Sequence, residues 1–215
     1  KFIAKSNGGH ASAPGKNTPL VRLGKFMAEA EKAECFDVYM SDTVKEMLSR
    51  FSPTMSGIMK TACSNVNAFK PVLKKVMPMI SPAGAALLRT TLAFTMSKGS
   101  DGANVIPQEA WVVGNMRFSH HQGKKSSIDA ITALAKKYDI ETVITDDGIE
   151  SGITDFKGEA FRFIEKAVVA SSRSDMDFLF TYHVVEFVCI YTCCIYDVFC
   201  FKYAFICLDF NFFFN

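Results

Sequence analysis

The order in which strand-like and helix-like segments follow one another constrains the fold of this chain more than any other feature. Short apolar alternations predict strands, and apolar residues spaced along one helical face predict helices. In chain order the segments are a strand at 1–6, a helix at 17–33, a helical region at 41–88, strands at 90–96 and 110–118, a helix at 124–137 and a strand at 140–145.

Without the helical region, this order is that of the ferredoxin-like split βαβ arrangement. The sequence therefore predicts an α+β domain with a four-stranded antiparallel sheet, two helices on one face, and a helical insert over 41–88. Successive side chains of a strand point to opposite faces. On the third strand, Val112 is expected to face the helices, whereas Trp111, Val113, Asn115 and Arg117 are expected on the open face.

Polar residues and prolines predict where the helices begin and end. The expected N-terminal caps are Asn17, Ser41, either Ser126 or Ser127, and Asp155. Prolines remove a backbone donor and disrupt helix interiors, so they are expected to divide the insert into short pieces. These prolines are Pro53, Pro71, Pro78 and Pro82.

Charge and composition exclude several classes of protein. The 24 basic and 22 acidic residues give a net charge of +2, so we expect no nucleic acid among the partners. With 49% hydrophobic residues, a packed core is available and general disorder is excluded. The first residues do not show the basic, hydrophobic and small-residue order of a signal peptide, and we expect Lys1 to lie inside a larger protein.

Residues 171–215 differ in composition from the body of the chain. Ten of the 20 phenylalanines and five of the seven cysteines lie there. Its longest uncharged run, 187–196, is short for a membrane span of about 20 residues, so a membrane is not expected as a partner. These residue types share T-rich codons, and our hypothesis is that the tail is translated noncoding or out-of-frame DNA; a weak membrane anchor is the alternative. Peptides from 178–215 in native protein would contradict the first hypothesis.

Three features of the body are candidates for chemistry. The first is the segment GGHASAP at 8–14, which places His10 in a turn where it can donate a hydrogen bond to a developing oxyanion. The second is Asn104, just before a strand, and the third is Arg117, whose guanidinium suits a carboxylate. Taken singly, a surface histidine, a turn asparagine and a solvated arginine explain them equally well.

Together, GGHASAP, GxNVIPQEA and NMRF in this order resemble the lid, or dimerisation, domain of the zinc-dependent aminoacylase and carboxypeptidase family. The insert is most similar to that of the Gly-X carboxypeptidase and N-fatty-acyl-amino-acid hydrolase branch. The resemblance implies that His10 stabilises the oxyanion in the partner subunit's active site, and that Asn104 and Arg117 bind substrate. Gly8, Gly9 and Pro14 would shape the histidine loop.

The same resemblance implies domain boundaries and a zinc site outside this chain. Residues 1–146 would form the dimerisation domain, 147–170 the start of the C-terminal part of an α/β catalytic domain, and 171–215 a tail outside the native fold. The family's HxD and Glu-Glu zinc motifs do not occur in the body. His183 is in the wrong context for the terminal ligand, and His120 and His121 have no further ligand at suitable spacing.

The sequence therefore predicts a fragment of a zinc metallohydrolase that cleaves an amide bond next to a free carboxylate, in a peptide or an N-acyl amino acid. By resemblance it is a homodimer through the lid domain, and the chain alone is expected to bind no zinc and to be inactive. The alternative is a standalone ferredoxin-like module that dimerises and binds a ligand without catalysis. The two widely separated body cysteines favour a reducing compartment such as the cytoplasm.

Overall fold

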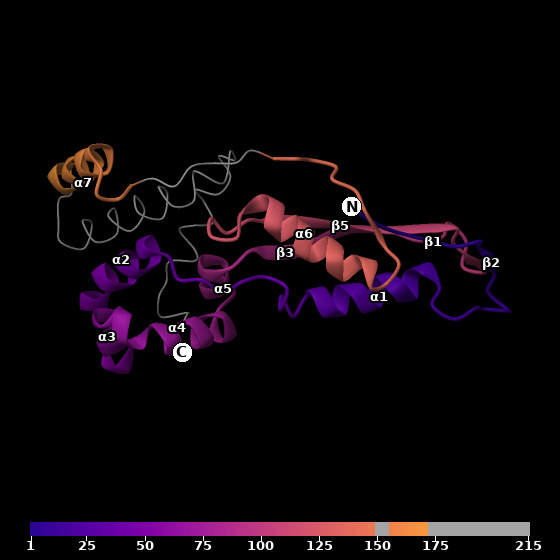
Figure 1. Cartoon of the computed structure of the whole chain (residues 1–215), viewed down its shortest axis with the longest axis horizontal. Coiled ribbons are helices and arrows are strands. Elements are labelled where there is room, and N and C mark those ends of the chain that lie inside the picture. The colour runs from indigo at the N-terminus through magenta and orange to yellow at the C-terminus, as the bar shows by residue number, and fades with distance from the viewer. Residues whose placement is uncertain (149–154, 172–215) are drawn as a thin grey trace. The chain divides into compact units, whose positions relative to one another are not determined.

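The computed structural model describes residues 1–148 and 155–171 (Figure 1). Two compact units are present. The first combines 1–39 with 82–148, and the second combines 40–81 with 155–171 among the described residues. The predicted domain boundaries at 146 and 170 stay a prediction, and the predicted tail, 171–215, lies outside the described residues from 172 onward.

The first unit is built on a four-stranded antiparallel sheet with the order β3-β5-β1-β6. The central strands pair over four residues, from Phe2 opposite Val112 to Lys5 opposite Glu109. The strands are β1 (Phe2–Lys5), β3 (Thr91–Lys98), β5 (Glu109–Arg117) and β6 (Glu141–Thr142). This is the predicted fold class, with the strand order of a split βαβ unit.

Two helices, α1 (Pro19–Ala30) and α6 (Gly123–Lys136), cover one face of this sheet (Figure 1). Three phenylalanine rings fill the space beneath them. The Phe26 ring lies 4.7 Å from that of Phe2 and 5.8 Å from that of Phe94, in tilted and edge-on arrangements. Such aromatic pairs add about 0.5–1.5 kcal/mol beyond the burial of their surface.

The side chains of β5 alternate between the two faces of the sheet as predicted. Ala110 and Val112 are buried under the helices, whereas Asn115 and Arg117 are exposed. Gly114 lies on the covered face, where an added Cβ would come within 2.6 Å of Leu92. The alternation of β5 therefore leaves a polar end on the open face, beyond Trp111 and Val113.

The second unit contains the insert up to residue 81, whose first elements are α2 (Asp42–Phe51), a short 3₁₀ turn at Ser52–Thr54 and α3 (Gly57–Ser64). The predicted cap at Ser41 is confirmed, because its hydroxyl accepts from the Val44 N–H at 3.2 Å. The next helix, α4 (Val66–Ile80), contains both Pro71 and Pro78, so these prolines do not divide the insert as expected. Packing of α4 against α2 and α3 offsets the lost backbone bonds.

Three other predicted helix starts are wrong. Thr18, not Asn17, precedes α1, because Asn17 has a φ of +55° that a capping residue does not adopt. Helix α6 begins before Ser126, and Ser127 is buried inside it, where its hydroxyl donates to the Gly123 carbonyl at 2.7 Å. Asp155 accepts from the Lys157 N–H at 2.9 Å, ahead of the helix start.

The remaining helices follow short connections. Helix α5 (Pro82–Leu88) begins on its proline and leads into β3, and it belongs to the first unit. Helix α7 (Glu159–Ser171) belongs to the second unit, where the Glu165 carboxylate accepts from Arg50 at 3.0 Å. In the described part of the chain, no helix has the length and apolar character that crossing a bilayer requires.

Candidate functional site

A small two-stranded arm carries the histidine loop. It pairs β2 (Gly9–His10) with β4 (Val105–Ile106), so that His10 lies opposite Val105. The arm continues the ribbon formed by β1 and β5, because the Ser6 N–H donates to the Gln108 carbonyl at 2.8 Å between the two pairs. The loop predicted from sequence is therefore held by backbone pairing to the segment that contains Asn104.

Gly8 turns the chain from β1 into the arm. Its φ of +68° lies in the left-handed region, and an added Cβ would come within 2.8 Å of the Gln108 side chain and 3.3 Å of the Ile106 carbonyl. The Gly8 N–H donates to the Ser6 hydroxyl at 3.0 Å. Both the conformation and the close approach require glycine at this position.

The hydrogen bonds of His10 determine which ring nitrogen carries its proton. Nδ1 accepts from the Ser12 backbone N–H at 3.2 Å and lies 2.8 Å from the Ser12 hydroxyl. A nitrogen that accepts from an N–H is unprotonated, so we assign the neutral ring as the Nε2–H tautomer. The side chain is exposed, and its Nε2–H is therefore oriented by Ser12 as a hydrogen-bond donor toward solvent or a ligand.

Asn104 lies beside His10 on the same arm. Its carbonyl accepts from the Ala11 N–H at 2.9 Å, which joins the loop after His10 to the loop before β4. The turn before Asn104 is closed by two further bonds, from Gly102 N–H to the Ser100 hydroxyl and from Val105 N–H to the Gly102 carbonyl. The Asn104 side chain is exposed at the tip of this arm.

Arg117 lies at the other end of β5, opposite Thr91 of β3. Eight residue steps along a strand separate it from Glu109, where the arm begins, and this corresponds to about 26 Å. Among the described residues the exposed Arg117 guanidinium has no ion-pair partner. Within one chain, His10 and Asn104 are therefore neighbours, whereas Arg117 is too distant to reach the same small ligand.

The open face between these two ends carries both charge and apolar surface. The Lys1 ammonium lies 4.5 Å above the centre of the Trp111 ring, a cation–π contact. Lys5 donates to the Glu141 carboxylate at 2.8 Å, and this bond raises the pKa of Lys5. Because both members of this pair are exposed, it contributes little to stability.

The two adjacent histidines do not form a metal site with other described residues. His121 stacks on Tyr39, with ring centres 3.8 Å apart and planes at 10°. Within 1–148 and 155–171, no three His, Cys, Asp or Glu side chains are grouped closely enough to hold a metal ion. The described residues therefore do not fit a zinc site.

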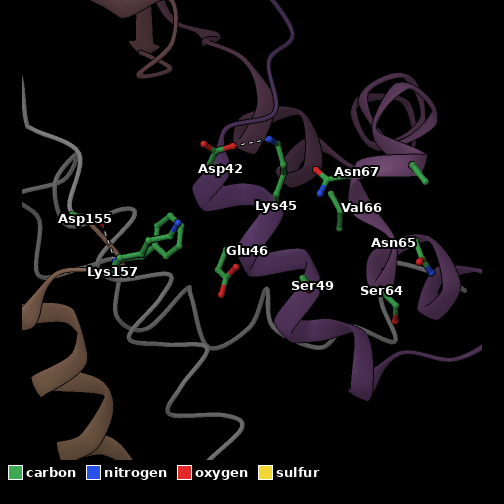
Figure 2. Close-up of a pocket in the computed structure, with 12 residues that line it drawn as sticks. Asp42, Lys45, Glu46, Ser49, Ser64, Asn65, Val66, Asn67, Asp155 and Lys157 are labelled. Atoms are coloured by element: carbon green, nitrogen blue, oxygen red, sulfur yellow. Dashed lines mark hydrogen bonds and ion pairs between the residues drawn. The ribbon is translucent and has the colours of Figure 1, made fainter.

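The second unit contains an open pocket that sequence reasoning missed (Figure 2). Its volume is about 730 Å³, and its walls come from α2, the α3–α4 junction and residues 155–157. Lys45 is paired with Asp42 at 2.6 Å, and this bond lowers the pKa of the Asp42 carboxyl. Charges of both signs line the pocket, and no arrangement of a nucleophile with a base is present in its described walls.

Comparison with known proteins adds an independent line of evidence. Residues 1–143 match the family described as "Peptidase dimerisation domain". Two similar curated proteins are the N-fatty-acyl-amino acid synthase/hydrolase PM20D1 of Xenopus tropicalis and of Homo sapiens. The first is 25% identical over 133 residues, which is 62% of this chain and 26% of that protein. The second is 30% identical over 128 residues, 60% of this chain and 24% of that protein.

The chain thus spans about a quarter of the length of the curated relatives it matches. No solved structure matches it significantly. The matched region contains the whole first unit up to β6, including both the arm and Arg117.

Proposed function

Because the chain belongs to the family of the peptidase dimerisation domain, we propose that it forms part of a hydrolase that cleaves an amide bond next to a free carboxylate. The resemblance inferred from the sequence motifs is confirmed at the level of this family. In the proposed role, the first unit joins two copies of the protein and supplies side chains that bind the substrate. Residues 147–170 would begin the following catalytic domain.

The edge strand β3 supports dimerisation. It lies at one side of the sheet and pairs, among the described strands, with β5 alone. It is eight residues long, and Lys98 at its end is its only charged residue. An edge strand of this length with few charges offers backbone donors and acceptors to a second strand. A second copy of the chain is the occupant we propose for this edge.

The separation of the arm from Arg117 supports a site made from two copies. One copy would contribute His10 and Asn104 from its arm, and the other would contribute Arg117. His10, oriented by Ser12, would donate its Nε2–H to the oxyanion, a role that needs a donor already fixed in place. Arg117 would bind the substrate carboxylate through two parallel hydrogen bonds.

The observation that carries this proposal is the pairing of His10 with the Asn104 segment on one arm, inside a matched dimerisation domain. The chemistry of the exposed arginine supports this substrate class, and the name of the relatives, N-fatty-acyl-amino acid synthase/hydrolase, agrees with it. Zinc ligands would have to come from residues other than those described.

The test uses the full chain and two small ligands. We expect N-octanoylglycine to bind in isothermal titration calorimetry and its methyl ester, which lacks the carboxylate charge, to bind at least tenfold more weakly. Arg117→Ala should cause a similar loss, whereas Arg162→Ala, at an exposed arginine of α7, should not. Equal binding of acid and ester, or an unaffected Arg117→Ala variant, would refute the assignment.

Sedimentation velocity tests the dimer separately. We expect the chain to sediment as a dimer at micromolar concentration, and His10→Ala to leave that dimer intact while weakening ligand binding. A monomer at these concentrations would refute the two-copy site. We also expect the chain alone to show no amidase activity; an activity that a chelator abolishes and zinc restores would contradict this.

A further inference from the structure

A long part of the chain contains no acidic residue. Between Glu46 and Asp101 there is no aspartate or glutamate, although basic residues are frequent. Within this stretch, residues 57–80 form α3 and α4, here called the α3–α4 segment. The segment contains four lysines, Lys60, Lys70, Lys74 and Lys75. Its charge of +4 exceeds the net charge of +2 of the whole chain, so positive charge is concentrated here.

The same segment exposes large apolar side chains. Ile58 of α3 is 79% exposed and Met79 of α4 is 76% exposed. On α4 the exposed apolar residues Val72, Val76, Met79 and Ile80 are spaced by four, three and one residues. This spacing places them along one side of a helix.

A different side of α4 packs against the rest of the second unit. Val66 and Leu73 are buried there, together with Cys63 of α3. At 3.6 residues per turn, Leu73 lies about 100° around the helix from Val72. Helix α4 therefore has one apolar side that packs inside its unit and a second, formed by Val72, Val76 and Met79, that the described residues leave exposed.

One lysine lies next to this exposed side. Lys75 is exposed and, three residues from Val72, lies about 60° around the helix from it. Lys60 is exposed on α3, but two residues after Ile58 it lies about 160° around that helix from it. Long lysine side chains can keep their ammonium groups at a polar surface while apolar neighbours enter a less polar layer.

We propose that the α3–α4 segment binds the surface of an anionic lipid bilayer. Exposed apolar side chains on helices that carry lysines and no acidic residue favour binding at a bilayer interface. The apolar residues would enter the boundary between headgroups and acyl chains, and the lysines would contact lipid phosphates and carboxylates. An acidic protein could form ion pairs with the lysines, but it would explain the exposure of the apolar Ile58 and Met79 less well. The sequence predicts no membrane partner because it lacks a spanning segment, but interfacial binding does not require one.

The experiment measures binding of the full chain to vesicles. We expect binding to vesicles of phosphatidylcholine with 30% phosphatidylserine, and much weaker binding to phosphatidylcholine alone. Each lysine near an anionic surface contributes roughly fivefold in affinity, so Lys60→Glu with Lys75→Glu should reduce binding by at least about 25-fold. Raising the salt concentration to 1 M should also weaken it, because the Debye length falls to about 3 Å.

Matched controls separate this segment from the rest of the chain. Lys16→Glu with Lys32→Glu makes the same charge change at exposed lysines of the first unit and should have little effect. Ile58→Ser with Met79→Ser should weaken binding at least tenfold, whereas Ile144→Ser, at another exposed apolar residue, should not. Amide hydrogen exchange should show new protection within 57–80 when vesicles are present.

Several outcomes would overturn the proposal. Equal binding to neutral and anionic vesicles would show that the lysines do not contribute to the affinity. Binding that survives both variants of the segment would place the contact elsewhere in the chain. Loss of self-association in Ile58→Ser with Met79→Ser, without any change in vesicle binding, would identify a second copy as the occupant. Circular dichroism of each variant should match that of the wild type, because all substituted residues are exposed.

Discussion

Replacing Gly8 by alanine tests how the arm is held in place. The residue has a φ of +68°, and a left-handed conformation costs a residue with a Cβ about 1–2 kcal/mol. The new Cβ would also displace the exposed Gln108 side chain, at a cost of about 0.5–1 kcal/mol. Alanine also lowers the conformational entropy of the unfolded chain, which stabilises the folded state by about 0.4–1 kcal/mol. The expected net loss is about 1–2 kcal/mol.

This loss should appear as local opening of the arm, because small peripheral elements open without global unfolding. Amide exchange of Ala11, whose N–H donates to the Asn104 carbonyl, reports that opening directly. We expect it to accelerate by roughly 5–30-fold in Gly8→Ala. Gly15→Ala is the control, since a Cβ there meets nothing within 4 Å and its φ is not positive.

Two results would refute this reasoning. Unchanged exchange at Ala11 in Gly8→Ala would mean that the left-handed turn does not hold the arm. Equal acceleration in Gly15→Ala would mean that any side chain added to this loop loosens it.

Three further predictions concern the core. Phe26→Ala removes a fully buried ring and should lower the free energy of unfolding by about 3–5 kcal/mol in urea denaturation, whereas Phe163→Ala, at a 74% exposed ring, should change it by less than about 0.5. Gly114→Ala should cost about 1–3 kcal/mol in the same assay, because its Cβ would overlap Leu92; a stability equal to wild type would show that Leu92 moves freely. Burial raises the pKa of the Cys63 thiol above its ordinary value of 9.0. The folded state therefore keeps a proton that the unfolded state loses, and the free energy of unfolding should fall as pH rises through 9. In Cys63→Ala this fall should be shallower between about pH 8 and 10.

The fold could be predicted where a local pattern determines the outcome. The two faces of β5 follow from its alternation, and Ser41 caps α2 as expected, because both depend on neighbours only a few residues apart. Helix starts that depend on distant contacts were not predictable in this way. Ser127 has a capping side chain, yet it is buried within α6, where its hydroxyl meets that of Thr90 at 2.9 Å.

Prolines and short strands show the same limit. Pro71 disfavours a helix locally, but α4 continues through it because its apolar side packs within the second unit. The last strand was expected over 140–145 but is paired only at Glu141–Thr142, opposite Phe2 and Ile3 of β1. The length of a strand depends on how much of its partner is available, and β1 is short.

The amino-acid sequence by itself determined the order of the elements, the face on which Arg117 lies, and the motifs that link the chain to its family. These properties depend on residue type and on short spacings. Only the tertiary structure decided that His10 and Asn104 share one arm while Arg117 lies about 26 Å along β5 from its base. Strand pairing joins segments about 95 residues apart in sequence, and no local pattern specifies which segments meet.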